Sequence, residues 1–514
     1  MKGNQSSPML PQKQSGTAPA TVNKWLVTVT IMTGSLLAVI DTSIVNVAIP
    51  KIQASFGVSI TQVSAVATFY IISNVIVMPL TGYLNALLGR KQFYAGAIIL
   101  FTLSSLLCGL AWNLPSLVCF RILQGLAGGA LLPSAQAILF ETFPKEEHGK
   151  AMGIFGLGVI VGPAISPVLG GYLTDTVGWR SIFTVNLLPG ILAAVMVLRF
   201  IQNPPYLKKP QGKFDWSGLA TLVIGLSTLQ YALENGQRLG WFNSRLIVFL
   251  AVIGVVSLAY LVRRELVTRN PVVDLSAFGN RTFVAGNVIG VLAGFSLYGL
   301  LFVLPVFMSQ ILHFNTIQIG LALMPGALST AVAMPIAGRL ADRLDPRLSL
   351  AVGITIFLLA SWQFSYLNQQ SGYWDLFWPQ VGRGFGLGLV FVPLSSATLG
   401  SVSKAKTASA SGLYNLIRQL GGSIGIAALL LMLQRLENFH LHQLAGVGIN
   451  RAGVNPSSIP QASAILADLH QQAAVLAYDD LFRYSTFIFA VSYLPLFFLR
   501  VQRTSQRQSS IPLD

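Results

Sequence analysis

Long apolar segments alternate with short polar ones along most of this chain. Fourteen apolar stretches of about 20 residues, the length that a helix needs to cross a bilayer, begin at Trp25. They centre near residues 37, 73, 102, 127, 161, 190, 225, 254, 296, 328, 357, 387, 420 and 491. Residues 1–24 are polar and predict a disordered tail, and the first apolar stretch is too long for a secretory signal. The pattern predicts an all-α polytopic membrane protein with fourteen transmembrane helices.

Composition and charge agree with that pattern. Hydrophobic residues make up 53% of the chain and charged residues only 10%, which is far from the balance of a soluble domain. If the N-terminus is inside, 23 of the 33 Lys and Arg residues lie in cytoplasmic segments and 6 lie outside. The sequence therefore predicts two cytoplasmic termini. The net charge of +16 then reflects membrane orientation and contact with anionic lipids, and no nucleic-acid partner is expected.

Two sequence motifs occur twice. GYLNALLGRK at 82–91 matches GRLADRLDPR at 338–347 with an offset of 256, and the segment from Arg121 matches the one from Arg383 with an offset of 262. Two matches at nearly one offset predict duplicated six-helix halves. The predicted parts are a tail at 1–24, a first bundle at 25–200, a linker with two inserted helices at 201–280, a second bundle at 281–501 and a tail at 502–514. We expect a loop at 233–245 between the inserted helices, and an irregular or partly helical outer loop at about 435–480.

Asp41 is the single carboxylate that we expect deep inside an apolar stretch. Such a carboxylate costs about 2.5–3.5 kcal/mol on insertion scales, so it usually faces a cavity and has a function. Asp41 lies nine residues before Pro50, where the first span exits, and Arg121 lies six residues after Pro115, where the fourth span enters. Their depths agree within roughly 5 Å. The pair is predicted to handle a proton or a cation, and the alternative is a buried pair that only fixes helix packing.

Several motifs together resemble a known family. They are Asp41 to Pro50 (DTSIVNVAIP), Arg121, Gln124, Gly125, Gly128 and Gly129 in the fourth span, Gly158, Gly162, Pro163, Gly170 and Gly171 in the fifth, Trp179 to Phe183 with Asn186, Pro189 and Gly190, Phe214 to Trp216, and Leu413 to Asn415 with Arg418 to Ser423. In this order they are similar to the fourteen-span drug:proton antiporters of the major facilitator superfamily, such as the EmrB and QacA type. The resemblance extends from Trp25 to Arg500.

The resemblance implies a major facilitator fold of two six-helix bundles plus two inserted helices, in the bacterial cytoplasmic (inner) membrane. It implies export of small amphipathic substrates driven by a proton gradient, with no cofactor. A periplasmic adaptor protein and an outer-membrane channel are expected partners if the host is Gram-negative. The chain departs from the family in its first loop motif, where Ala86 and Leu87 replace Asp and Arg, and the second copy keeps them as Asp342 and Arg343. It also has Ala65 where a tryptophan is common.

The remaining site predictions fall into two groups. Polar residues at span depth are candidates for the substrate cavity or for bonds between helices: Asn46, Tyr70, Asn74, Gln124, Gln136, Tyr298, Asn415, Arg418 and Gln419. Candidates for conformational change are Gly82, Gly89, Arg90, Gly158, Gly162, Pro163, Gly338, Asp342 and Arg343. The glycine-rich fifth span is either a flexible seal between the halves or a tight packing surface. No metal site is predicted: His440 and His442 give a weak signal, and Cys108 and Cys119 have no metal-ligand spacing.

Other functions remain open. The same fold could export or flip a lipid, a siderophore or a metabolite, because apolar cavity walls suit many ligands. An intramembrane enzyme is a distant alternative, since the sequence has no evident nucleophile and base at one depth. A passive channel would carry flux without proton coupling. The match of Gly421 to Gly425 to the hydrolase pattern GxSxG lies in an apolar stretch and follows no strand, so helix packing explains it. No phosphate-binding loop is present.

Overall fold

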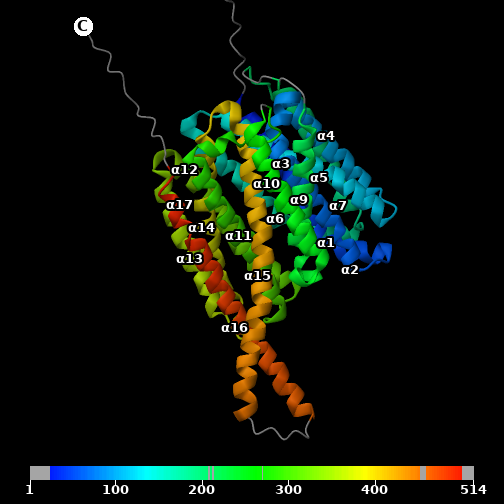
Figure 1. Ribbon diagram of the computed structural model, residues 1–514, viewed down its shortest axis with the longest axis vertical. Helices are drawn as coiled ribbons and strands as arrows, with labels where there is room; N and C mark the ends of the chain where they lie inside the picture. The colour runs from blue at the N-terminus through cyan, green and yellow to red at the C-terminus, as the bar shows by residue number, and fades with distance from the viewer. Residues whose placement is uncertain (1–22, 206–208, 211–213, 269, 452–458, 500–514) are drawn as a thin grey trace, which may run out of the picture.

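The computed structural model describes residues 23–205, 209–210, 214–268, 270–451 and 459–499. The predicted tails at 1–24 and 502–514 lie almost entirely outside the described residues. Within these residues, fourteen long helices, joined by short turns and one-turn helices, form an elongated bundle (Figure 1). Both ends of the described chain, Asn23 and Leu499, lie at one end of the bundle, here called the terminal end. A hairpin formed by α15 and α16 projects from the other, here called the hairpin end.

Six long helices form each half. In the first half they are α1 (Lys24–Phe56), α3 (Ala65–Leu88), α4 (Arg90–Gly109), α5 (Leu114–Thr142), α6 (His148–Thr176) and α8 (Leu187–Phe200), with the single turns α2 (Ile60–Val63) and α7 (Ser181–Thr184). The inserted pair is α9 (Trp216–Leu239) and α10 (Arg245–Val267). In the second half they are α11 (Arg281–Gln310), α12 (Thr316–Arg343), α13 (Pro346–Gln363), α14 (Tyr373–Gly400), α15 (Thr407–Arg451) and α16 (Ile459–Ala490), followed by the turn α17 (Tyr493–Leu496).

The two halves repeat one pattern of helix contacts. In the first half α1 packs on α6, α3 on α5 and α4 on α8. In the second half α11 packs on α15, α12 on α14 and α13 on α16. Each contact in the first half therefore has a counterpart in the second at the same place in the order of helices, as a duplicated sequence requires.

The halves meet along two seams. One seam joins α6 to α12, and the other joins α3 to α15. Towards the terminal end both seams depend on glycine, because a Cβ on Gly82 of α3 would overlap Ser409 of α15, and a Cβ on Gly338 of α12 would lie 2.6 Å from the carbonyl oxygen of Gly149 of α6. The absence of side chains at these two positions lets the backbones approach closely.

The inserted helices cover one seam only. α9 packs against both α3 and α15, and α10 packs on α9. The predicted loop at 233–245 is wrong in its first half, because α9 continues to Leu239 and ends at Gly240, whose φ of 80° is a left-handed helix cap. The charged segment at 233–239 looked like a loop because Glu234 and Arg238 interrupt the apolar pattern. In the helix these side chains find polar partners on α2, on α3 and on α9 itself.

Twelve helical segments among the described residues are long and apolar enough to cross a membrane. The long helices outside that set are α14 and α16, which carry Asp375 and Arg383, and Asp468, Asp479, Asp480 and Arg483, respectively. The predicted centre of the last span, residue 491, is wrong: α16 ends at Ala490. The charged residues in the first part of α16 interrupt the apolar pattern, so the pattern did not predict where this helix begins.

The predicted outer loop at about 435–480 is helical wherever it is described. α15 continues without a break to Arg451, and α16 begins at Ile459 (Figure 1). At 1.5 Å per residue the 45 residues of α15 span about 68 Å, roughly twice the hydrocarbon core of a bilayer. His440 of α15 bonds to Asp480 of α16 at 2.9 Å, which joins the two helices at the base of the hairpin.

Asp215 fixes the start of the inserted pair. Its carboxylate caps α9 by accepting the backbone N–H of Gly218 at 2.9 Å, and it accepts bonds from Nε and Nη2 of Arg264 near the end of α10, each at 2.8 Å. The Arg264 hydrogen bonds are the main reason that the pKa of Asp215 falls to about 2. One side chain thus caps one helix and ties it to the next.

Asp215→Asn should lower the melting temperature of the purified protein at pH 7, because it removes the charged bond to Arg264 while keeping a capping oxygen. Asp215→Ala should lower it further, since loss of a cap costs about 1 kcal/mol. A carboxyl whose folded pKa is lowered stabilises the fold above its ordinary range near pH 4, and this contribution is lost as pH falls towards 2. The difference between wild type and Asp215→Asn should shrink over that window in melting curves. A constant difference down to pH 2 would contradict this assignment.

Candidate functional site

The predicted pair of Asp41 and Arg121 exists. Nη1 of Arg121 in α5 lies 2.6 Å from Oδ2 of Asp41 in α1. The two side chains are almost completely buried, at 0% and 1% exposure. A charge-assisted bond of this length in a region without solvent is strong, but removing two charges from water is costly. The polar groups around the pair must therefore offset that cost.

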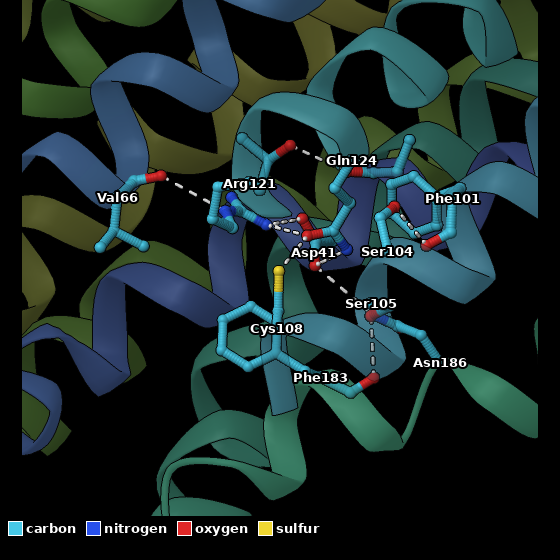
Figure 2. A network of polar contacts seen from close by, with 12 residues as sticks. Asp41, Val66, Phe101, Ser104, Ser105, Cys108, Arg121, Gln124, Phe183 and Asn186 are labelled. Atoms are coloured by element: carbon cyan, nitrogen blue, oxygen red, sulfur yellow. Dashed lines mark hydrogen bonds and ion pairs between the residues drawn. The ribbon is translucent and has the colours of Figure 1, made fainter. Parts of the chain in front are cut away.

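Neutral polar groups surround the pair (Figure 2). Nε2 of Gln124 donates to Oδ1 of Asp41 at 2.9 Å, and its Oε1 accepts from Nη1 of Arg121 at 2.7 Å. Nδ2 of Asn186, which directly precedes α8, approaches the same Oδ1 at 3.4 Å and donates to Ser105 of α4 at 3.0 Å. The Cys108 thiol lies 3.6 Å from Oε1 of Gln124. Both carboxylate oxygens of Asp41 are therefore bonded.

The position of Arg121 follows from the close packing of α5 on α3. Gly125 lies against the backbone of Tyr70, and a Cβ added to Gly128 would lie 2.9 Å from the Tyr70 hydroxyl. This approach places the guanidinium 4.0 Å from the centroid of the Tyr70 ring and lets its Nε donate to the Val66 carbonyl at 3.3 Å. The cation is thus held by an aromatic face, a carbonyl and a carboxylate.

This arrangement is suited to a chemical switch between two states. A proton added to Asp41 would remove the negative charge that Arg121 neutralises, and the guanidinium would then need another acceptor. A nearby cation favours the ionised form of the carboxyl, whereas burial favours its neutral form, so the two effects act on Asp41 in opposite directions. Both effects depend on what surrounds the carboxyl group.

A second polar network crosses from one half to the other. Oε1 of Gln136 in α5 accepts from Nδ2 of Asn415 at 2.6 Å and from the Ser411 hydroxyl at 2.8 Å, both in α15. Nη2 of Arg418 donates to Oδ1 of Asn415 at 3.1 Å, and the guanidinium lies 4.9 Å from the Phe391 ring centroid. Because α5 carries both Arg121 and Gln136, one helix connects the ion pair to the contact between halves.

The candidates for the substrate cavity are not gathered in one place. Tyr70 and Gln124 belong to the ion-pair network, and Gln136, Asn415 and Arg418 to the network between halves. Asn74 is buried in α3, Asn46 is exposed on α1, and Gln419 is half-buried on α15. Tyr298 of α11 packs against Gly422 of α15. Their role in substrate binding stays a prediction.

The second loop motif forms a contact between halves. Asp342, at the end of α12, accepts the backbone N–H groups of Gly149 and Lys150 at 2.7 and 2.9 Å. These groups lie in the first turn of α6, where unpaired N–H groups and the helix dipole favour a carboxylate. Gly338 faces the same turn, and Arg343 is exposed. The motif thus connects α12 of one half to α6 of the other at the terminal end.

The first loop motif lacks this contact. Gly82 packs against Ser409 as Gly338 packs against Gly149, but Ala86 occupies the position of Asp342 and offers no acceptor. Gly89 has a φ of 87°, which glycine adopts without strain, and it lies next to Gln92 and Asn203. Arg90 forms a buried ion pair with Glu141 of α5. Among the residues that the structure describes, one seam therefore has a carboxylate contact of this kind and the other does not.

Two predicted glycines of α6, Gly158 and Gly162, contact α1. A Cβ on Gly162 would lie 2.8 Å from a Val39 methyl group, and Gly158 lies against Met32. Pro163 is exposed. Ser166 adds a hydrogen bond of 3.2 Å to the Ile40 carbonyl. These glycines pack α6 within its own half, and their part in conformational change stays a prediction.

Among the described residues no group of three or more His, Cys, Asp or Glu side chains could hold a metal ion. His440 bonds to Asp480, and His442 is exposed. Cys108 is buried beside the ion pair and Cys119 is exposed on another helix. The weak metal signal of the two histidines therefore has a simpler explanation for His440, a helix-to-helix bond.

Comparison with known proteins identifies the family. The family model described as Major Facilitator Superfamily matches residues 31–426. The chain belongs to the major facilitator superfamily. The solved structure of the human organic anion transporter MFSD10 (TETRAN) has the same fold, with a TM-score of 0.64 at 15% identity over 93% of this chain and 99% of that one. The family consists of transporters, so the alternative of an intramembrane enzyme is excluded, and the chain is an integral membrane protein.

Curated relatives place the chain in the EmrB group. It is 32% identical to the multidrug export protein EmrB of Escherichia coli (strain K12), over 86% of this chain and 85% of that protein. It is 30% identical to the colistin resistance protein EmrB of Acinetobacter baumannii, over 92% and 96%. The fatty acid resistance protein FarB of Neisseria gonorrhoeae is 32% identical over 80% and 82%. The predicted family, fold class and transporter assignment are confirmed.

Three polar residues of this transporter were not singled out by sequence reasoning. Asn186 was noted only as part of a motif, although it approaches Asp41 from a segment 145 residues away. Asp41 was expected to be the single carboxylate deep in an apolar stretch. The structure adds two acids near helix ends, Glu234 five residues before the end of α9 and the buried Glu265 two residues before the end of α10. Both acids lie close to Lys or Arg in the sequence, which made their segments resemble loops.

Asp342→Asn should slow transport several-fold while expression and folding are kept. The amide retains one acceptor but loses the charge that favours the first turn of α6. Ala86→Asp should be tolerated, since the first motif has no carboxylate contact to lose. Both variants would be measured in a transport assay, with yield and melting temperature as the folding controls. Full transport by Asp342→Asn would show that the single latch is dispensable.

Proposed function

We propose that this protein is a secondary active exporter that couples inward proton flow to the efflux of amphipathic or lipophilic compounds by alternating access. The observation that carries the proposal is the buried pair of Asp41 and Arg121 at 2.6 Å. An ionisable residue inside a membrane bundle is by default a functional one. The sequence has no phosphate-binding loop, so the energy comes from an ion gradient or from a partner, and we propose the gradient.

The proposed mechanism uses α5 as the connection between proton and substrate. Protonation of Asp41 weakens its bond to Arg121, and the guanidinium turns to another acceptor, with Gln124 and the Val66 carbonyl already in contact with it. A shift of α5 that follows would change the hydrogen bonds of Gln136 to Ser411 and Asn415 in the other half. Proton binding would in this way bias the contact between the halves.

The relatives support an export function but leave the cargo open. Their names refer to multidrug export, colistin resistance and fatty acid resistance. A lipid-like cargo is a second candidate, because a fatty acid resistance protein is 32% identical to this chain. Small amphipathic molecules include both classes, and we propose them as the substrates. An adaptor protein and an outer-membrane channel stay a prediction.

Asp41→Asn should abolish efflux driven by a pH gradient. Asparagine has the shape of the protonated acid but cannot release a proton, so the site would stay in one state. The measurement is transport in proteoliposomes with an imposed gradient, screened against lipophilic cations, neutral drugs and lysolipids. Asp41→Glu should keep partial function because it restores titration with one extra methylene.

The matched control for this test is Asp175→Asn, which removes an exposed carboxylate that pairs with Lys51. It should transport like wild type. Melting temperature checks that Asp41→Asn folds. Undiminished proton-coupled efflux by Asp41→Asn would refute the role of Asp41, and wild-type flux that ignores the pH gradient would favour a passive channel.

We also propose that the terminal end is cytoplasmic and the hairpin end faces outside the cytoplasmic membrane, from the excess of Lys and Arg in the segments at the terminal end. Single cysteines at Lys209 and Asn438, both exposed, test this in a Cys119→Ser background. A membrane-impermeant maleimide should label Asn438→Cys in spheroplasts and Lys209→Cys only after the membrane is broken. Labelling of both from the same side would contradict the orientation.

A further inference from the structure

A groove lies between the first half and the inserted helices. It has a volume of about 470 Å³ and is lined by α3, α5, α9 and α10, with Phe69, Ile72, Ile122, Tyr231, Leu246 and Leu250 among its residues. This volume is within the range of about 300–1,000 Å³ that is typical of small-molecule sites. The groove is separate from the ion-pair network, because Asp41, Tyr70, Arg121 and Gln124 are not among its lining residues.

The groove is apolar and open. The hydroxyl groups of Ser73 and Thr228 donate to the carbonyl oxygens of Phe69 and Ile224 one helical turn earlier, both at 2.7 Å. Their hydrogen-bond donors are therefore already used within their own helices. Leu246 exposes about half of its surface, so the groove is accessible on the side of α10. In a membrane this side faces the bilayer, from which a lipophilic molecule could enter.

A carboxylate on α9 lies one helical turn beyond the groove residues, towards the hairpin end. Glu234 follows Tyr231 of the groove by one helical turn of α9, and it is hydrogen-bonded to Thr68, the residue before Phe69 of the groove. Gln230 donates to Glu234 at 2.9 Å and also to Ser423 of α15 at 2.8 Å. Glu234 therefore stands where α3, α9 and α15 meet.

The partners of Glu234 are neutral. The hydrogen bonds described for its carboxylate come from Gln230 and Thr68, whereas Asp41 and Asp215 each bond to an arginine. The nearest arginine on the same helix, Arg238, donates instead to Asn235 and to the Thr61 carbonyl. A carboxylate at this depth with neutral partners is costly, and a cation from outside the chain would offset that cost.

We propose that the groove and Glu234 form a binding site for an amphipathic cation. Its apolar body lies along the groove between α3 and α10, and its positive group approaches the Glu234 carboxylate. This inference rests on the proposed export of amphipathic compounds and adds a site at which one class of them binds. The groove residues Phe69 and Ile122 directly adjoin Tyr70 and Arg121 in sequence. A bound cation would therefore contact α3 and α5, the helices that carry Tyr70 and Arg121.

The test measures binding of tetraphenylphosphonium to the purified full-length protein by equilibrium dialysis. Glu234→Gln should raise its Kd about tenfold or more by removing the charge, and Leu250→Trp should do the same by filling the groove. The matched controls are Asp175→Asn, an exposed carboxylate, and Phe249→Trp, the exposed neighbour of Leu250 that does not line the groove. Both controls should bind like wild type.

A neutral probe separates charge from shape. Triphenylphosphine has similar rings and no charge, so Leu250→Trp should weaken its binding and Glu234→Gln should leave it unchanged. Unchanged tetraphenylphosphonium binding in Glu234→Gln would overturn the inference. So would a loss in Glu234→Gln with normal binding in Leu250→Trp, because the cation would then lie outside the groove. Melting temperatures of the variants establish that they fold.

The outcome is distinguishable from a failure of the proposed function. If wild type shows proton-coupled efflux and the Glu234 and Leu250 variants bind cations normally, the groove inference fails while the export function stands. If wild type shows no gradient-driven transport but the variants lose cation binding, the export mechanism fails and the binding site stands.

Discussion

The burial of one carboxylate and one guanidinium inside the first half is the constraint on which the rest of this structure depends. Two charges without water must satisfy every polar atom locally, because an unmatched buried charge costs several kcal/mol. Asp41 and Arg121 meet this requirement with Gln124 from α5, Asn186 at the start of α8 and the Val66 carbonyl near the start of α3. Groups near or on four helices of one half converge on a single point, so any change in its protonation affects all of them.

The close approach of helices at glycines links the ion pair to the rest of the fold. Gly125 and Gly128 bring α5 onto α3, and α5 reaches the second half through Gln136. At the terminal end the seams are alike in packing but unlike in charge, since only α12 supplies a carboxylate, Asp342, to the facing helix. A duplicated fold has in this way become asymmetric at one residue. The inserted helices add a second asymmetry, because α9 covers the seam of α3 and α15 and brings Glu234 to it.

Much of the helical fold was predictable from the sequence, because a bilayer restricts which backbone structures can cross it. Long apolar stretches must be helices, since backbone groups in lipid need internal partners. Duplicated motifs at nearly one offset predicted two related halves, and the helix contacts repeat accordingly. Asp41 and Arg121 could be paired from their distances to prolines at the ends of their spans, because helical rise converts sequence separation into depth. The same logic failed for Glu234 and for α16, where charged residues in helices resemble loops.

The sequence by itself determined that the chain is built of long apolar helices, that they form a duplicated set, and at what depth two charges lie. Only the tertiary structure decided what surrounds those charges. Asn186 reaches Asp41 from 145 residues away, Gln136 bonds to the other half, and Glu234 meets Thr68 and Gln230. Depth depends on distance along one helix, which the sequence records. Neighbours depend on how helices rotate and pack against one another, and close contacts at glycines set that rotation only in the folded chain.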